Sequence, residues 1–251
     1  MQSGGTRRAM VAMAALGSLL TMTTLSACGS TDTRRTSGWE GRPGPQATHP
    51  RKAVAAPAPT RIPDVGDRLH RDIPAGTRQV LAVYGDGKDS PTSTAVLFTK
   101  HGSTWNRTRS WPAHNGKKGW TLDHRLGDER SPVGVFTLTA AAGVLDDPGT
   151  ALPYTQDEGY AAPRDWDESH WHDFDYVIAI DYNRVPGTPP DDAEQPEGED
   201  KGGGIWLHLD HGSGTSACVS LPKEAMEYLL RTLDPERHPV VLMGDRMDLK
   251  G

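Results

Sequence analysis

The stretch "GGGIWLHLDHGSGTSACVSLPKEAMEYLLRTL", residues 202–233, contains two regular patterns separated by small residues. In its first part, Leu207 and Leu209 share one face and Trp206 and His208 share the other, which is the alternation of a β-strand. Its last part places apolar residues along one stripe of a helix: Ala225, Met226, Leu229, Leu230 and Leu233. The stretch therefore predicts a strand, a loop and a helix.

Cys218 lies in this loop, close to the expected start of the helix. Ser220 can act as a helix cap, and Pro222 suits the first helical turn. Helix-end amides favour negative charge, so this position predicts a lowered thiol pKa. The residues before Cys218 are small and leave room for a substrate carbonyl: Gly212, Gly214, Thr215, Ser216 and Ala217. Cys218 is therefore a candidate nucleophile, and a buried structural cysteine is the alternative.

A nucleophilic thiol needs a base within hydrogen-bond reach. His208 is preferred over His211, because a strand fixes the direction of a side chain better than a loop does. The second ring nitrogen then needs a partner, and the carbonyl of Leu209 is a candidate. The alternative for His208 is a hydrogen-bonded structural histidine.

The N-terminal region has the features of an export signal. Arg7 and Arg8 precede an apolar stretch that ends in "LSAC" at Cys28, too short for a confident membrane-spanning helix. This ending resembles the lipobox of bacterial lipoproteins, which implies that Cys28 is lipidated. The alternative is ordinary cleavage after small residues, with Cys28 incidental. With Cys28 lipidated, Cys218 is the one remaining cysteine, and a lone thiol outside the cytoplasm is a liability unless it is buried or used.

Composition divides the chain into three parts. Residues 1–28 form the expected signal peptide, and residues 29–75 are rich in Pro and Gly without apolar periodicity, as expected of a disordered, flexible tether. Residues 76–247 are long enough for one domain with a sizeable core. The net charge of −6 argues against a nucleic-acid-binding surface.

The proposed domain contains many short strand patterns and one clear helix. The strand patterns fall at residues 77–85, 94–100, 103–111, 133–138, 175–181, 204–209 and 239–244. Many strands with little helix predict a mainly β fold, a β-sandwich with one or two helices.

Three motifs together resemble the catalytic domain of the L,D-transpeptidase (YkuD-type) family. "GGGIWLHL" followed by "GTSACVSL" is similar to that family's strand histidine and cysteine motif. "RSPVGVFTL", residues 130–138, resembles its Thr-Pro-x-Gly-x-Phe/Tyr segment, and "DYVIAIDYN", residues 175–183, its intervening strand. Two positions depart from the family pattern: Ala217 replaces the usual glycine, and Ser220 replaces an Arg or Asn.

The resemblance implies a YkuD-like β-sandwich and a specific set of roles. Cys218 is the nucleophile and His208 the general acid/base, while oxyanion and substrate contacts come from Gly214, Thr215, Ser216, Ala217 and Ser220. The implied reaction forms 3-3 cross-links between peptidoglycan stem peptides through a thioester acyl-enzyme, without cofactor or metal. A monomer is expected, anchored through lipidated Cys28 to the outer face of the cytoplasmic membrane and facing the cell wall.

Other functions stay open at this point. Water as the acceptor would make the same site an L,D-carboxypeptidase, and a non-catalytic wall-binding lipoprotein would leave Cys218 without a role. A metal-dependent wall peptidase could use His208, His211 or the pair His170 and His172, which strand alternation would place on one face. The acidic insertion at residues 187–203 is either a solvated loop or a flap over the site.

Overall fold

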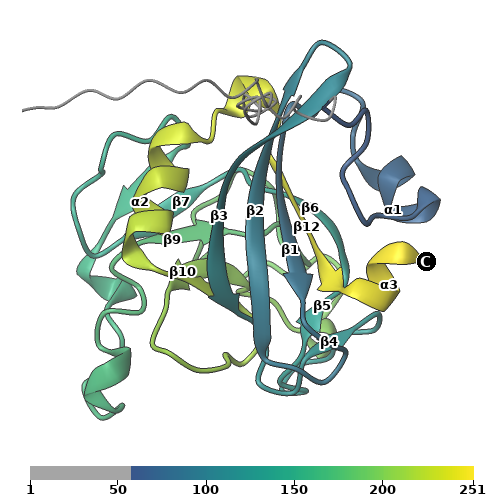
Figure 1. The fold of residues 1–251 in the computed structure, drawn as a ribbon. Helices are drawn as coiled ribbons and strands as arrows, with labels where there is room; N and C mark the ends of the chain where they lie inside the picture. Colours follow the sequence, from purple (N-terminus) through teal and green to yellow (C-terminus); the bar gives the residue numbers. More distant parts are fainter. Residues whose placement is uncertain (1–57) are drawn as a thin grey trace, which may run out of the picture. The chain divides into compact units, whose positions relative to one another are not determined.

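The computed structural model describes residues 58–251 and is mainly β, which confirms the predicted fold class (Figure 1). The signal and lipobox around Cys28 lie outside the described residues. A ten-stranded mixed sheet has the order β6-β12-β1-β2-β3-β11-β10-β9-β7-β8. These strands are β1 (Gln79–Gly85), β2 (Thr92–His101), β3 (Thr104–His114), β6 (Gly134–Thr137), β7 (Ala141–Gly143), β8 (Tyr154–Gln156), β9 (Val177–Ala179), β10 (Trp206–Leu209), β11 (Val219–Leu221) and β12 (Val240–Asp245).

Short elements complete the described part of the chain. β4 (Trp120–Thr121) and β5 (Ser131–Pro132) pair separately from the large sheet. The α-helices are α1 (Asp67–Asp72), α2 (Lys223–Thr232) and α3 (Arg246–Lys250). The 3-10 helices are η1 (Glu158–Tyr160), η2 (Glu168–His170), η3 (Glu199–Lys201) and η4 (Pro235–Arg237).

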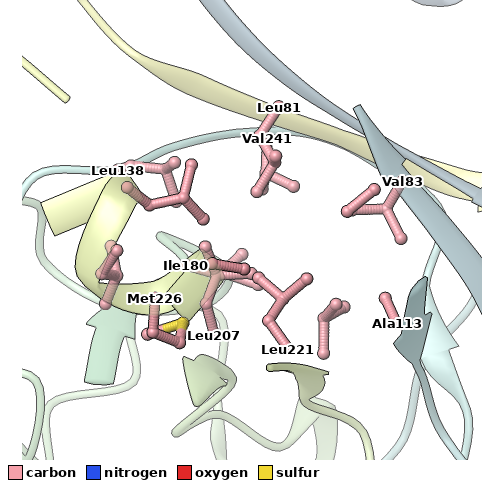
Figure 2. Packing of buried hydrophobic residues seen from close by; sticks show 14 of the residues in the cluster. Leu81, Val83, Ala113, Leu138, Ile180, Leu207, Leu221, Met226 and Val241 are labelled. Carbon is pink, nitrogen blue, oxygen red and sulfur yellow. The ribbon is translucent and has the colours of Figure 1, made fainter. Parts of the chain in front are cut away.

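The two halves of the large sheet enclose one hydrophobic core. β3 and β11 join them through a single residue pair, His114 with Ser220. In Figure 2, Leu81 and Val241 of the first half lie across the core from Leu207 and Leu221 of the second half. This packing resembles a sandwich, although the two layers belong to one continuous sheet.

The alternation of β10 and β11 separates a core face from a second face. Leu207 and Leu209 of β10 lie in the core, as do Val219 and Leu221 of β11. The two strands are parallel, with Leu207 opposite Val219 and His208 opposite Ser220. Because successive side chains alternate, the residues between these core positions face away from the core.

The predicted helix is confirmed as α2, which begins at Lys223 and buries the expected apolar stripe against the core (Figures 1 and 2). The predicted capping role of Ser220 is wrong. The N-cap is Pro222, without a side-chain hydrogen bond, and Ser220 belongs to β11. Residues 219–221 pair with β10 as a strand, so this strand separates Cys218 from the helix end.

The folded unit begins upstream of the predicted boundary at residue 75. Ile62 and Leu69 are buried in a second hydrophobic cluster with Val80 and Phe98, on the far side of β1 and β2. α1 lies within the region assigned to the tether, and Leu249 of α3 joins the same cluster. The predicted boundaries therefore missed both terminal helices. Among the described residues, no helix is long and apolar enough to span a membrane.

Candidate active site

Cys218 lies immediately before β11, against the beginning of β10. The strand register places it beside Trp206, whose backbone N–H donates to the Cys218 sulfur at 3.4 Å. The thiol in turn lies 3.8 Å from the carbonyl oxygen of Gly204. The residue as a whole is partly buried, and these two backbone contacts fix the position of its sulfur.

His208 lies on β10, on the same face as Trp206 and diagonal to Cys218 across the parallel pair. Its Nδ1 is 2.8 Å from the carbonyl oxygen of Leu209, which confirms the predicted partner. Because a carbonyl only accepts, Nδ1 carries the hydrogen and Nε2 has the free lone pair. The ring is 3% exposed and packs edge-on against Phe174 at 5.4 Å.

The pKa values of both groups favour the uncharged form at neutral pH. Burial raises the pKa of the Cys218 thiol to about 11 and lowers the pKa of His208 to about 4. The predicted lowering of the thiol pKa is therefore wrong. The physical reason is that β11 separates Cys218 from α2, so desolvation acts without the compensating field of a helix end.

Two hydroxyl groups fix the backbone of the loop that carries the nucleophile. Thr215 Oγ1 donates to the carbonyl oxygen of Cys218 at 2.6 Å, and Ser131 Oγ donates to that of Ala217 at 2.6 Å. Ser131 Oγ also accepts from Gly116 N at 2.9 Å. Within residues 58–251, no backbone carbonyl accepts a hydrogen bond from the amides of Ser216, Ala217 or Cys218. These amides are therefore available to an oxyanion.

Gly214 allows this loop to approach a neighbouring segment closely. A Cβ atom at Gly214 would lie 2.7 Å from Lys117 Cα and 2.8 Å from Pro91 Cβ. Thr215 continues the contact, because its amide donates to the carbonyl of Asn115 and its carbonyl accepts from Lys117. Gly214 is thus a packing residue of the loop rather than an evident substrate contact.

Ser220 is fully buried and does not reach the open part of the site. Its hydroxyl donates to Asp210 Oδ1 at 2.7 Å, and the same oxygen is 2.8 Å from His114 Nδ1. Desolvation opposes the charge of Asp210, but these hydrogen bonds hold the pKa of its carboxyl below the usual value. Ser220 therefore stabilises the seam between the two halves of the sheet.

An aromatic rim lies beside the nucleophile and contacts the acidic insertion. Trp206 packs edge-on against Phe174 and Tyr160. Trp206 Nε1 donates to the carbonyl of Pro190 at 3.1 Å, and the Tyr160 hydroxyl donates to Asp191 at 2.6 Å. These two bonds dock one part of the insertion next to the β10 residues that hold Cys218.

The alternative metal pair, His170 and His172, is not formed. Residues 168–170 form η2 rather than a strand, so the two side chains do not alternate along one face. His170 Nδ1 lies 2.8 Å from Asp173, whereas His172 Nδ1 lies 3.1 Å from Asp175 and its side chain is 78% exposed. Instead, His211 approaches Asp173, with Nδ1 3.0 Å from Oδ2.

Sequence reasoning assigned no role to Ser131, and it considered Asp173 only as a possible metal ligand beside His170 and His172. Ser131 lies 86 residues before Ala217, and its bond to that carbonyl depends on tertiary folding. The sequence signal for Ser131 is the "SPVG" segment. This segment resembles a family motif, but the resemblance does not indicate what the serine does. Asp173 could not be paired with His211 from spacing alone.

Comparisons with known proteins agree with the motifs. No curated protein matches the sequence significantly. The solved structures similar to this chain include Bd1075 from Bdellovibrio bacteriovorus, with 16% identity, a TM-score of 0.38, and coverage of 73% of this chain and 52% of that chain. They also include the helical cell shape determining protein Pgp2 from Campylobacter jejuni, with 15% identity, a TM-score of 0.39, and coverage of 67% of this chain and 48% of that chain. The chain thus spans about half the length of these solved chains. The family model YkuD, the L,D-transpeptidase catalytic domain, matches residues 89–242, more than half of the chain, and the protein therefore belongs to this family.

Proposed function

We propose that this protein is a cysteine-dependent L,D-transpeptidase that forms 3-3 cross-links between peptidoglycan stem peptides. The observation that carries the proposal is the position of Cys218, held by the Trp206 amide on the same face as the oriented imidazole of His208. A nucleophile, a base and an orienting group for that base are the elements of nucleophilic acyl transfer.

The first half-reaction begins from a neutral thiol and a neutral imidazole. Cys218 Sγ attacks the carbonyl carbon at the L-centre of the third stem residue while its proton moves to His208 Nε2. The loop amides at Ala217 and Cys218 stabilise the tetrahedral oxyanion. His208 then gives the proton to the nitrogen of the terminal D-alanine, the C–N bond breaks, and a thioester remains on Cys218.

The second half-reaction releases the enzyme. The amine of a neighbouring stem attacks the thioester carbonyl and gives its proton to His208. As the C–S bond breaks, that proton returns to the Cys218 sulfur, and the new amide is the 3-3 cross-link. Water in place of the amine yields a shortened stem, the L,D-carboxypeptidase reaction, and product analysis with a stem-peptide donor distinguishes the two.

The location that suits this substrate is the outer face of the cytoplasmic membrane. Lipidation of Cys28 would hold the catalytic domain there, with the tether spanning the distance to the wall. Metabolic labelling with a fatty-acid analogue tests this part separately. Label should be incorporated into the wild-type chain and lost in Cys28→Ala.

Acylation by a carbapenem is the most direct test of the cysteine chemistry. The family resemblance implies that this drug class acylates the nucleophile, so intact mass should increase by one drug molecule and peptide mapping should place it on Cys218. Cys218→Ala should show no adduct, and His208→Gln should react about 100-fold or more slowly. His172→Asn, an exposed histidine outside the site, is the matched control and should react at the wild-type rate.

Rival functions give different results in two companion experiments. A metal-dependent peptidase would still process stem peptides after its thiol is alkylated. If the protein is a wall-binding lipoprotein, the Cys218→Ala variant would bind wall polymer as well as the wild type does. Either result, together with the absence of an adduct, would overturn the proposal.

A further inference from the structure

Three potential metal ligands meet beside β10 in a cluster formed by His170, Asp173 and His211. Each offers a ligand atom, and these atoms lie within 4.8 Å of one another. His170 Nδ1 and His211 Nδ1 approach the same carboxylate oxygen, Asp173 Oδ2, at 2.8 and 3.0 Å. Two imidazole nitrogens and one carboxylate oxygen are a ligand set typical of zinc and related divalent transition metals.

His211 is the member whose environment calls for a further partner. Its side chain is 4% exposed, and neither ring nitrogen has a hydrogen-bond partner among the described residues. Nδ1 lies 3.0 Å from Asp173 Oδ2, which is an ion-pair contact without a regular hydrogen bond. A buried imidazole without a satisfied nitrogen costs free energy, and an ion placed between the ligands would remove that cost.

The spacing of the donor atoms also fits an ion. Two ligand atoms that each lie about 2.1 Å from a tetrahedral ion are about 3.4 Å apart. The observed 2.8 and 3.0 Å are slightly shorter, and small rotations of the imidazole rings would open them. The two rings lie 4.1 Å apart at a 52° angle, so both imidazoles lie beside the same carboxylate.

The backbone holds the ligands together before any ion binds. Asp167 accepts from Ser169 N and caps η2, and Asp173 N donates to the carbonyl of His170. Leu209 N donates to the carbonyl of Asp173 at 2.9 Å, which ties this segment to the end of β10, two residues before His211. Such preorganisation favours metal binding.

We propose that His170, Asp173 and His211 bind one divalent transition-metal ion, zinc being the ion that this donor set fits best. The side chain of His170 is 31% exposed, so a fourth position would face solvent and take water or an anionic ligand. The site is distinct from the thiol, because its ligands come from η2, the segment after it, and the turn after β10. It does not depend on the proposed cysteine chemistry.

Metal binding to the whole purified protein tests this directly. After treatment with a chelator and dialysis, the protein should bind one Zn²⁺ per chain by isothermal titration calorimetry, and Co²⁺ should give the visible absorption bands of a tetrahedral site. His170→Asn and Asp173→Asn should weaken Zn²⁺ binding by at least about 100-fold. His172→Asn is the matched control on the same segment and should bind as the wild type does.

Two further variants separate this site from the catalytic one and from misfolding. Cys218→Ala should retain full Zn²⁺ binding, which distinguishes the site from adventitious binding at the thiol and keeps the result independent of transpeptidase activity. Near-UV circular dichroism verifies the fold of each variant. If Asp173→Asn does not fold, His170→Asn provides the test, because the His170 side chain is partly exposed and its replacement should disturb the fold less. No Zn²⁺ binding by the wild type, or equal binding by folded His170→Asn, would overturn the proposal.

Discussion

The pKa values of Cys218 and His208 both favour the neutral form at pH 7, so the reactivity of the site depends on how the two groups are placed and not on a preformed thiolate. In the proposed reaction the thiol proton leaves as the carbon–sulfur bond forms, and His208 Nε2 has a free lone pair to accept it because Nδ1 donates to the Leu209 carbonyl. A neutral thiol is also less easily oxidised than a thiolate. The neutral state therefore makes the Cys218 thiol less prone to oxidation.

The pKa of Cys218 predicts slow alkylation of the free enzyme. Burial raises the pKa of the thiol from 9.0 to about 11, which lowers the thiolate fraction at pH 8 about 100-fold. The more basic thiolate is intrinsically more nucleophilic, so the net rate should be about 10-fold lower than for an ordinary cysteine. Iodoacetamide labelling followed by intact mass should show a rate that still rises above pH 9. A plateau below pH 8 would show that the protein holds a thiolate after all.

Ser131 is a positioning residue whose hydroxyl supports the nucleophile loop. Ser131→Ala removes the donor to Ala217 O and the acceptor of Gly116 N, so it should lower the free energy of unfolding by about 1–3 kcal/mol. It should also slow carbapenem acylation, because the loop amides lose their fixed position. Urea unfolding and acylation kinetics measure the two effects. Ser131→Thr keeps the hydroxyl and should restore the acylation rate, and an equal loss in both variants would contradict this role.

At the level of elements, β11 and α2 together place Cys218. β11 fixes the residue after the nucleophile through its pairing with β10, and α2 covers the open side of the core with its apolar stripe. The strand is three residues long, so most of its stability comes from packing against neighbours rather than from intrinsic propensity. The position of the nucleophile therefore depends on the burial of α2.

A cavity in α2 should destabilise the whole domain. Leu229 is fully buried, and Leu229→Ala should lower the free energy of unfolding by about 2–5 kcal/mol through lost burial and an unfilled cavity. Glu224→Ala, on the exposed face of the same helix, is the control and should change stability by less than about 0.5 kcal/mol. Urea denaturation measures both. A similar small effect for both variants would mean that α2 is not part of the cooperative core.

At the level of the whole molecule, two hydrophobic clusters lie on opposite faces of β1, β2 and β12. The first lies between the halves of the sheet. The second depends on residues far apart in sequence, including Ile62 and Leu69 before β1 and Leu249 in α3. The terminal segments of the described region therefore belong to the folded domain, because they supply part of its second hydrophobic cluster.

Truncation tests this boundary. A chain that begins at residue 76 loses Ile62, Val65 and Leu69, each of which contributes about 1.5–3 kcal/mol of burial before the entropy of ordering the segment is subtracted. Its melting temperature should fall by at least about 10 °C relative to a chain that begins at residue 58. Thermal unfolding followed by circular dichroism measures the difference. Equal melting temperatures would restore the boundary at residue 75.

The sequence by itself determined the local patterns of this protein and the motifs of its family. Alternation in β10 and the helical stripe of α2 depend only on neighbouring residues, so both elements and the candidate pair Cys218 and His208 could be predicted. Short strands such as β7 and β11 could not, because three residues carry too little periodicity. The N-terminal segment was missed for a similar reason, since its few apolar residues resemble a linker until the sheet they cover is known.

Only the tertiary structure decided the electrostatic state of the thiol and the contacts that join distant segments. The Cys218 pKa depends on the water that folding removes and on the distance to α2, which strand β11 sets. The bond from Ser131 to Ala217, and the meeting of His211 with Asp173, join residues that no spacing rule relates. These residues come into contact only when the whole core has packed, and patterns among neighbouring residues do not specify that packing.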